Sequence, residues 1–175
     1  MRFPWPSRRR EHDPYWERFI HRAPADPNNL ITHAFKAVKP GGVNPVRGEI
    51  HSPDVMTSHV KELGRFFGAD QVAVVQLGHS SELPFAIVCG LRSEYDTRTT
   101  PGVGGQAPAL KGLFVSFNLV AYIKELGYRA SRSMDDAERL AVIGSVGRQG
   151  PELHIAEVIR TDLPLQPDIQ EQASV

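Results

Sequence analysis

The segment from residue 144 to residue 150 has the residue types that most clearly suit ligand binding. It holds three glycines, a serine and an arginine within seven residues. Glycine has no side chain, so it lets backbone amides come close to a ligand, and the guanidinium of Arg148 can bind a phosphate or a carboxylate. The same composition also suits a tight helix-to-strand connection with a surface arginine, and both interpretations stay open.

A second glycine-rich segment, Gly102 to Ala107, matches the GxGxxA pattern in front of an expected helix. A dinucleotide-binding fingerprint follows a strand directly and has an acidic residue about 20 residues further on, after a second strand. Here the segment lies within a long loop, and Glu125 falls inside the helix. We therefore expect no Rossmann site. The segment is either a plain loop or a helix start whose free amides bind a phosphate.

Cys89 is the only cysteine of the chain. A single thiol excludes an intramolecular disulfide, a CxxC redox pair and any cluster held by four thiolates from these residues. Cys89 ends the apolar run 85–89, which predicts a buried structural thiol rather than a nucleophile. The seven histidines show no HxxxH or HExxH spacing, so we predict no metal site.

The composition is that of an ordinary globular domain. The 175 residues suit one core, and 41% of them are hydrophobic while 23% are charged. Lysine and arginine together number 20, as do aspartate and glutamate, so no net field attracts nucleic acid or an anionic membrane. No apolar run approaches the ~20 residues of a membrane span. We expect no nucleic-acid partner, no membrane partner and a cytoplasmic location.

The spacing of apolar and turn residues predicts a domain that mixes helices and strands. A helix over 53–67 begins after Ser52, which can cap it, and ends before Gly68, which suits the left-handed C-cap position. The strand over 83–90 is almost wholly apolar, which predicts a central strand covered on both faces. The other predicted elements are strands at 71–77, 128–131 and 153–160, a loop at 92–108, and helices at 109–126 and from Asp135 or Asp136 to 143.

Residues 1–50 differ from the rest of the chain, because proline and glycine recur there and break any long element. Trp5, Tyr15 and Trp16 make this segment too apolar for a disordered tail. We expect an N-terminal arm over 1–50 that packs on the domain formed by 51–175, or on a partner subunit.

Three segments, in this order, resemble the corrinoid-binding catalytic domain of reductive dehalogenases and, more distantly, epoxyqueuosine reductase. The first is 59–70, a helix that ends in Phe67-Gly68-Ala69-Asp70, similar to the "fGAD" of the family. The second is 120–130, close to the family's A-x-x-I-R-x-L-G-Y-x-A. The third is the turn 140–150 with the strand exit 156–168, which contains Thr-Asp-Leu-Pro-Leu-Gln-Pro-Asp and is similar to the family's TDLPL-x-PD.

The resemblance implies an α+β fold, a nitroreductase-like α/β sandwich with a mixed sheet. It implies cobalamin bound base-off, without a protein histidine on cobalt. The cofactor-binding residues would be Gly144, Ser145, Val146, Gly147, Arg148, Gly150, Thr161, Asp162 and Leu163. The family's catalytic tyrosine has no clear counterpart, and Tyr128 and Tyr95 are the candidates.

The family's two CxxCxxCxxxCP motifs do not follow Asp168 here, so we expect the iron–sulfur domain to be lacking. A cobalamin-dependent reductase would then need electrons from a separate ferredoxin or flavoprotein. A cobalamin carrier or processing protein would need none. Two alternatives stay open: an FMN-binding, nitroreductase-like oxidoreductase, which often forms a homodimer, and a cofactor-free subunit or regulator derived from the fold.

Overall fold

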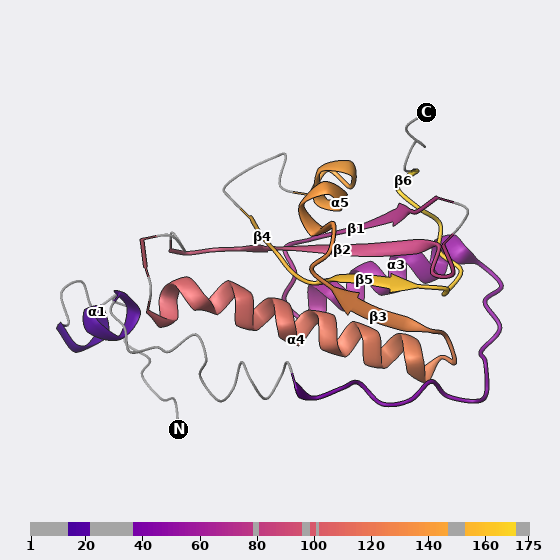
Figure 1. Cartoon of the computed structure of the whole chain (residues 1–175), viewed down its shortest axis with the longest axis horizontal. Helices are drawn as coiled ribbons and strands as arrows, with labels where there is room; N and C mark the ends of the chain where they lie inside the picture. Colours follow the sequence, from indigo (N-terminus) through magenta and orange to yellow (C-terminus); the bar gives the residue numbers. More distant parts are fainter. Residues whose placement is uncertain are drawn as a thin grey trace, which may run out of the picture.

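A computed structural model of the chain describes residues 14–21, 37–78, 81–95, 99–100, 102–146 and 153–170 (Figure 1). Its centre is a six-stranded sheet in the order β3-β5-β2-β1-β6, with β4 paired to β2 as well. All pairs are antiparallel except β1 with β6, so the sheet is mixed, and the predicted α+β class is confirmed. The strands are β1 (Gln71–Gln76), β2 (Phe85–Arg92), β3 (Ala130–Ser133), β4 (Leu153–Ile155), β5 (Val158–Thr161) and β6 (Ile169–Gln170).

Helices cover both faces of this sheet. The four described helices are α1 (Pro14–His21), α3 (Pro53–Phe66), α4 (Val103–Glu125) and α5 (Ala137–Ile143). Helices α3 and α4 pack on one face, and α5 packs on the other (Figure 1). None of the helices in these described ranges is long and apolar enough to cross a membrane.

Strand β2 is the central strand, as its apolar sequence predicts. Ile87 and Cys89 point into the core beneath α3 and α4, while Ala86 and Val88 point into the core beneath α5. Because both faces are covered, neither set of side chains can be polar. Burial raises the pKa of the Cys89 thiol to about 12, so the thiol stays protonated and unreactive in the folded protein.

Helix α3 has the predicted ends. Pro53 occupies its first turn, and Gly68 follows it with φ of +110°. Ser52 stands at the N-cap position, but its side chain makes no capping hydrogen bond. Ser52 therefore occupies the predicted N-cap position, but its side chain does not cap the helix.

Helix α4 begins at Val103, so the predicted loop over 92–108 is wrong beyond residue 102. A Cβ on Gly105 would lie 1.9 Å from the carbonyl oxygen of Thr100, and one on Gly104 would lie 2.7 Å from the side chain of Ile20. These glycines therefore let the first turn of α4 pack closely against neighbouring segments. Glycine signals close approach here, although on sequence alone it indicates a flexible loop.

The predicted last strand is interrupted at residues 156 and 157, which separate β4 from β5. The backbone N–H of Ala156 donates to the carbonyl of Cys89 at 2.9 Å, and Ala156 packs against Gly112 of α4. The carboxylate of Glu157 accepts a hydrogen bond from the buried Ser116 at 3.2 Å. It also lies 3.4 Å from Nη1 of Arg132. A half-buried polar contact therefore links the break between β4 and β5 to α4.

Residues 37–50, the described part of the arm next to the domain, run along the C-terminal half of α4 (Figure 1). The N–H of Asn44 donates to the carbonyl of Lys124 at 2.9 Å, and the N–H of Gly48 donates to that of Leu126 at 2.9 Å. Gly127, with φ of +83°, ends α4 where a Cβ would lie 2.5 Å from the carbonyl oxygen of Val46. The arm therefore follows the end of the helix at backbone distance.

Candidate functional site

A cleft of about 510 Å³ lies where the end of α3, the start of β1 and the turn after α5 meet. Three of the residues predicted to bind a cofactor, Gly144, Ser145 and Val146, form one wall. Gly147, Arg148 and Gly150 lie outside the described residues. The complete lining in the described ranges is Arg65, Asp70, Gln71, Val72, Ala73, Gly144, Ser145 and Val146.

The floor of the cleft is the edge of β1 that β6 leaves uncovered. β6 pairs only with Val75 and Gln76. Next to it, the N–H of Asp168 donates to the carbonyl of Val74 at 2.8 Å, and the N–H of Val74 donates to the carboxylate of Asp168 at 2.8 Å. In an antiparallel ladder, successive residues direct their N–H and C=O groups to opposite sides. Val72 therefore presents its backbone groups on the same edge as Val74, inside the cleft.

The turn 144–146 uses its own amides to close α5. The N–H of Gly144 donates to the carbonyl of Leu140 at 2.8 Å, that of Ser145 to Val142 at 3.1 Å, and that of Val146 to Ala141 at 2.9 Å. These three amides are therefore engaged within the protein. What the described part of the turn offers to a ligand is the side chain of Ser145, whose backbone has φ of +56°.

The same turn lies very close to the sheet. A Cβ on Gly144 would lie 3.0 Å from the Cβ of Ala73, and a Cβ on Gly90 of β2 would lie 2.7 Å from Cγ1 of Val146. The absence of a side chain at these two positions sets the turn against β1 and β2. One wall of the cleft is therefore held firmly relative to its floor.

The cleft contains one cation and one anion that the sequence interpretation did not assign. Arg65 lies in the last turn of α3, is exposed, and makes no ion pair with any residue in the described ranges. Asp70 follows the helix, and its Oδ2 accepts a hydrogen bond from the backbone N–H of Arg92 at 2.6 Å. The segment 59–70 that carries the family resemblance includes both, so that match could have identified them.

Thr161, Asp162 and Leu163 do not line this cleft. The hydroxyl of Thr161 donates to the carbonyl of Arg129 at 2.8 Å and accepts from the N–H of Leu163 at 3.0 Å. Leu163 is fully buried in the core beneath α3 and α4, whereas Gly144 packs toward the core beneath α5. The structure thus places the two predicted groups on opposite faces of the sheet. A cofactor role for the group 161–163 stays a prediction.

The rest of the strand exit is fastened to α3. The N–H of Gln166 donates to the hydroxyl of Thr57 at 2.8 Å, and that hydroxyl donates to the carbonyl of Gln166 at 3.0 Å. The carboxylate of Asp168 pairs with the ammonium of Lys61. In the described structure, this most family-specific stretch therefore holds β6 and α3 together at one end of the sheet.

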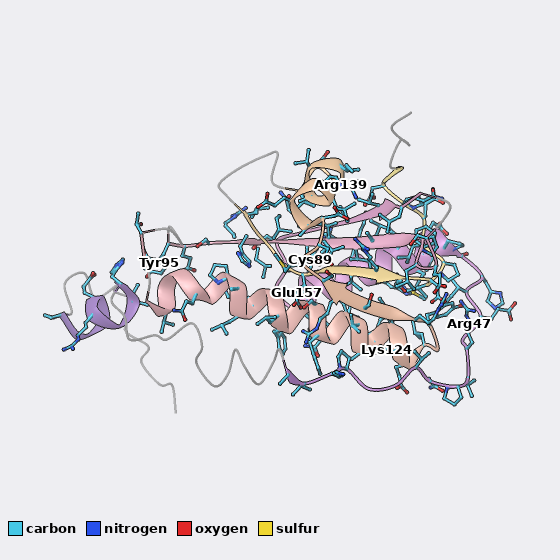
Figure 2. All side chains as sticks on the ribbon, in the orientation of Figure 1. Arg47, Cys89, Tyr95, Lys124, Arg139 and Glu157 are labelled. Atoms are coloured by element: carbon cyan, nitrogen blue, oxygen red, sulfur yellow. The ribbon has the colours of Figure 1, made fainter. Side chains whose placement is uncertain are left out.

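The two candidate tyrosines lie in other places. Tyr128 is 4% exposed, its hydroxyl donates to the carbonyl of Gly48 at 2.7 Å, and the guanidinium of Arg47 lies 4.2 Å from its ring centre. It thus fastens the arm to the domain. Tyr95 lies near the N-terminal end of α4 (Figure 2). It lines a separate pocket of about 180 Å³, together with Lys111. A catalytic role for either stays a prediction.

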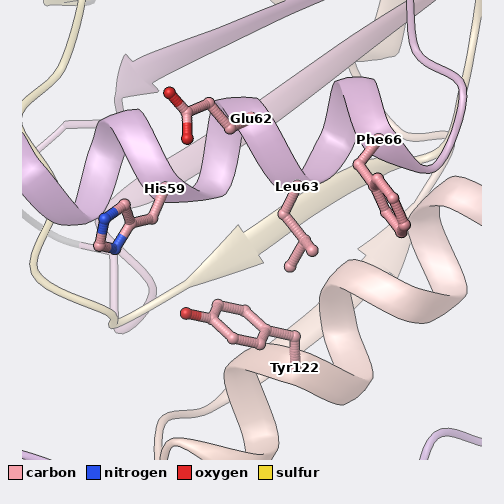
Figure 3. Close-up of a pocket in the computed structure, with 5 residues that line it drawn as sticks. All are labelled: His59, Glu62, Leu63, Phe66 and Tyr122. Carbon is pink, nitrogen blue, oxygen red and sulfur yellow. The ribbon is translucent and has the colours of Figure 1, made fainter.

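A third hollow, of about 290 Å³, lies between α3 and α4 (Figure 3). Leu63 and Tyr122 face each other across it, with His59 toward one end and Phe66 toward the other. Glu62 also lines it, and its carboxylate points away from Tyr122. It contains none of the residues predicted to bind a cofactor. In the described part of the chain, no group of three histidine, cysteine, aspartate or glutamate side chains gathers that could hold a metal ion.

Comparisons with known proteins give likeness in fold alone. No protein-family model and no curated protein matches the chain. The catabolic reductive dehalogenase NpRdhA matches with a TM-score of 0.63 at 18% identity, over 83% of this chain and 24% of that one. NpRdhA in complex with 3-bromo-4-hydroxybenzoic acid matches with a TM-score of 0.64 at 17% identity, over 82% and 26%.

A further reductive dehalogenase structure, described as suggesting a mechanism for B12-dependent dehalogenation, matches with a TM-score of 0.63 at 16% identity, over 82% and 26%. This chain therefore spans about a quarter of the length of these proteins. The predicted resemblance is confirmed: the chain has the fold of part of a reductive dehalogenase.

Proposed function

We propose that this chain binds cobalamin in the cleft at the open edge of β1. The observation that carries the proposal is the shared fold, because one of the matching dehalogenase structures is described as B12-dependent. The cleft supports it, since the predicted residues Gly144, Ser145 and Val146 form one of its walls.

The residues of the cleft fit the chemistry of the cofactor. The corrin ring is edged with amide groups, and the nucleotide tail carries a phosphate. The backbone of Val72 supplies an N–H and a C=O for amides, and the hydroxyl of Ser145 can donate or accept. Arg65 supplies the cation that a phosphate needs. At about 510 Å³ the cleft would take one side or the tail of so large a cofactor, with the ring lying partly outside.

In this proposal the chain binds and orients the cofactor, and bound cobalamin would supply a reducible cobalt centre held base-off. Electrons would come from a separate ferredoxin or flavoprotein, because the single cysteine cannot form a four-thiolate cluster. A carrier or processing role uses the same cleft and needs no electron donor.

One observation favours a second candidate, a cofactor-free subunit derived from the fold. The amides of the turn 144–146 are all bonded inside the protein, and Thr161 and Leu163 are fully buried. A domain that has kept these contacts for stability alone would have the same internal bonds.

Binding of hydroxocobalamin to the purified protein separates these candidates. Equilibrium dialysis would give the affinity, and the visible spectrum would report whether the bound cofactor is base-off. FMN is tested in parallel. Saturable cobalamin binding with a base-off spectrum supports the proposal. Retention of FMN alone would favour the nitroreductase-like alternative, and binding of neither would favour the cofactor-free one.

A further inference from the structure

Arg65 is the one cationic side chain in the described lining of the cleft. Its position in the last turn of α3 explains its presence partly, because a cation there interacts well with the helix dipole. The dipole does not explain why this exposed cation lines the rim of a cleft. Asp168, the acid on the strand exit beside β1, pairs with Lys61 instead.

Arg65 and Ser145 reach the cleft from opposite faces of the sheet. α3 packs on one face, and the turn after α5 packs on the other, with the edge of β1 between them. A guanidinium and a hydroxyl on two sides of an exposed strand edge form a set of donors for an anion of several oxygens. A phosphate has that form, and a planar guanidinium can bind two of its oxygens.

We propose that Arg65 binds the phosphate of the cobalamin nucleotide tail, with the hydroxyl of Ser145 as a second donor. This inference rests on the proposed function, and it adds a residue that sets which corrinoids the cleft prefers. Asp70 has the opposite effect, because its carboxylate lies in the same cleft and repels a phosphate. The arrangement therefore predicts opposite consequences for removing the two charges.

The test compares three corrinoids that differ in the tail. Hydroxocobalamin has the complete nucleotide, cobinamide lacks the phosphate, ribose and base, and cobinamide phosphate restores the phosphate alone. Their dissociation constants are measured by dialysis for the wild-type protein, for Arg65→Gln and for Asp70→Asn. Arg18→Gln, at an exposed position on α1 away from the cleft, is the matched control.

Arg65→Gln should weaken the binding of hydroxocobalamin and of cobinamide phosphate about tenfold, the cost of one charged hydrogen bond near solvent. It should leave the affinity for cobinamide unchanged. Asp70→Asn should strengthen the two phosphate-containing ligands and leave cobinamide unchanged. The Arg65→Gln effect should shrink as salt rises from about 0.05 to 0.5 M, because the contact is screened. Thermal unfolding of each variant checks that it is folded.

If Arg65→Gln loses affinity equally for all three ligands, or loses affinity for none of them, the assignment of Arg65 is overturned and cobalamin binding still stands. If the wild-type protein binds none of the three, the proposed function fails first and the role of Arg65 fails with it. The two failures are therefore distinguishable.

Discussion

The carboxylate of Asp162 accepts two hydrogen bonds from Arg129, one from its backbone N–H at 2.7 Å and one from its Nε at 2.9 Å. Arg47 of the arm lies 3.7 Å from the same carboxylate. This one side chain therefore joins the exit of β5, the entry to β3 and the arm. The hydrogen bond and charge of Asp162 raise the pKa of Arg129, which stays protonated at any physiological pH.

Replacing Asp162 with alanine should lower the free energy of unfolding by about 1 kcal/mol, the typical cost of losing charged hydrogen bonds near solvent. Urea unfolding followed by circular dichroism measures the change. Asp135→Ala removes an exposed acid whose side chain makes no hydrogen bond or ion pair with the described residues, and should change the stability far less. Equal effects of the two variants would contradict the structural role of Asp162.

The ion pairs of Asp136 should make the stability of the folded protein depend on pH. Hydrogen bonds and charge from Arg139, with a contribution from Arg160, lower its pKa below the ordinary 3.8. A carboxylate with a lowered pKa in the folded state stabilises the protein above its unfolded pKa, and this contribution disappears as the pH falls through the folded value.

Asp136→Asn isolates that charge, because asparagine also tolerates the left-handed backbone of φ 60° at this position. The variant should melt at a lower temperature than the wild-type protein at pH 7. The two melting curves should converge as the pH falls through the lowered pKa of Asp136 in the folded protein. A melting difference that persists at the lowest pH would assign the effect to something other than the ion pairs.

Gly105→Ala tests the early start of α4. In an open helix this change is favourable by about 1 kcal/mol, and in a flexible loop it is close to neutral. Here the added Cβ would meet the carbonyl oxygen of Thr100 at 1.9 Å, so the variant should lose about 1–3 kcal/mol of unfolding free energy. Gly41→Ala, where a Cβ meets nothing within 4 Å, is the control.

The sequence predicted correctly those elements that are determined by their own residues. Helix α3 ends at Phe66, just before Gly68 takes a positive φ, and β2 is apolar because both its faces are covered. The start of α4 was not predictable in this way, since the glycines that indicate a loop are required by contacts with Thr100 and Ile20.

The candidate site was predictable only in part, for a topological reason. Gly144 and Leu163 pack on opposite faces of the sheet, and no local pattern reports which face a turn or a strand exit covers. Arg65 joins the cleft because α3 ends beside β1, far from the turn 144–146 in sequence. Three residues of the predicted turn, Gly144, Ser145 and Val146, line the cleft, and their amides are bonded within the protein. Cofactor binding by this turn stays a prediction.

Ser145→Gly separates stability from binding at the cleft. Serine at φ of +56° is in a backbone region that glycine adopts without cost, so the variant should gain about 0.5–1 kcal/mol of unfolding free energy. It should also bind hydroxocobalamin more weakly, because the hydroxyl is removed. The same change at Ser131, in strand β3, should only destabilise. A stabilised variant with unchanged affinity would remove Ser145 from the site.

Hydrogen–deuterium exchange with and without hydroxocobalamin tests the location of the site most directly. The cofactor should slow exchange in peptides that cover 65–73 and 140–146, and leave peptides from the hollow between α3 and α4, centred on Tyr122, unchanged. Protection confined to that hollow or to 161–163, or no protection at all under saturating cobalamin, would contradict a cofactor site at the open edge of β1.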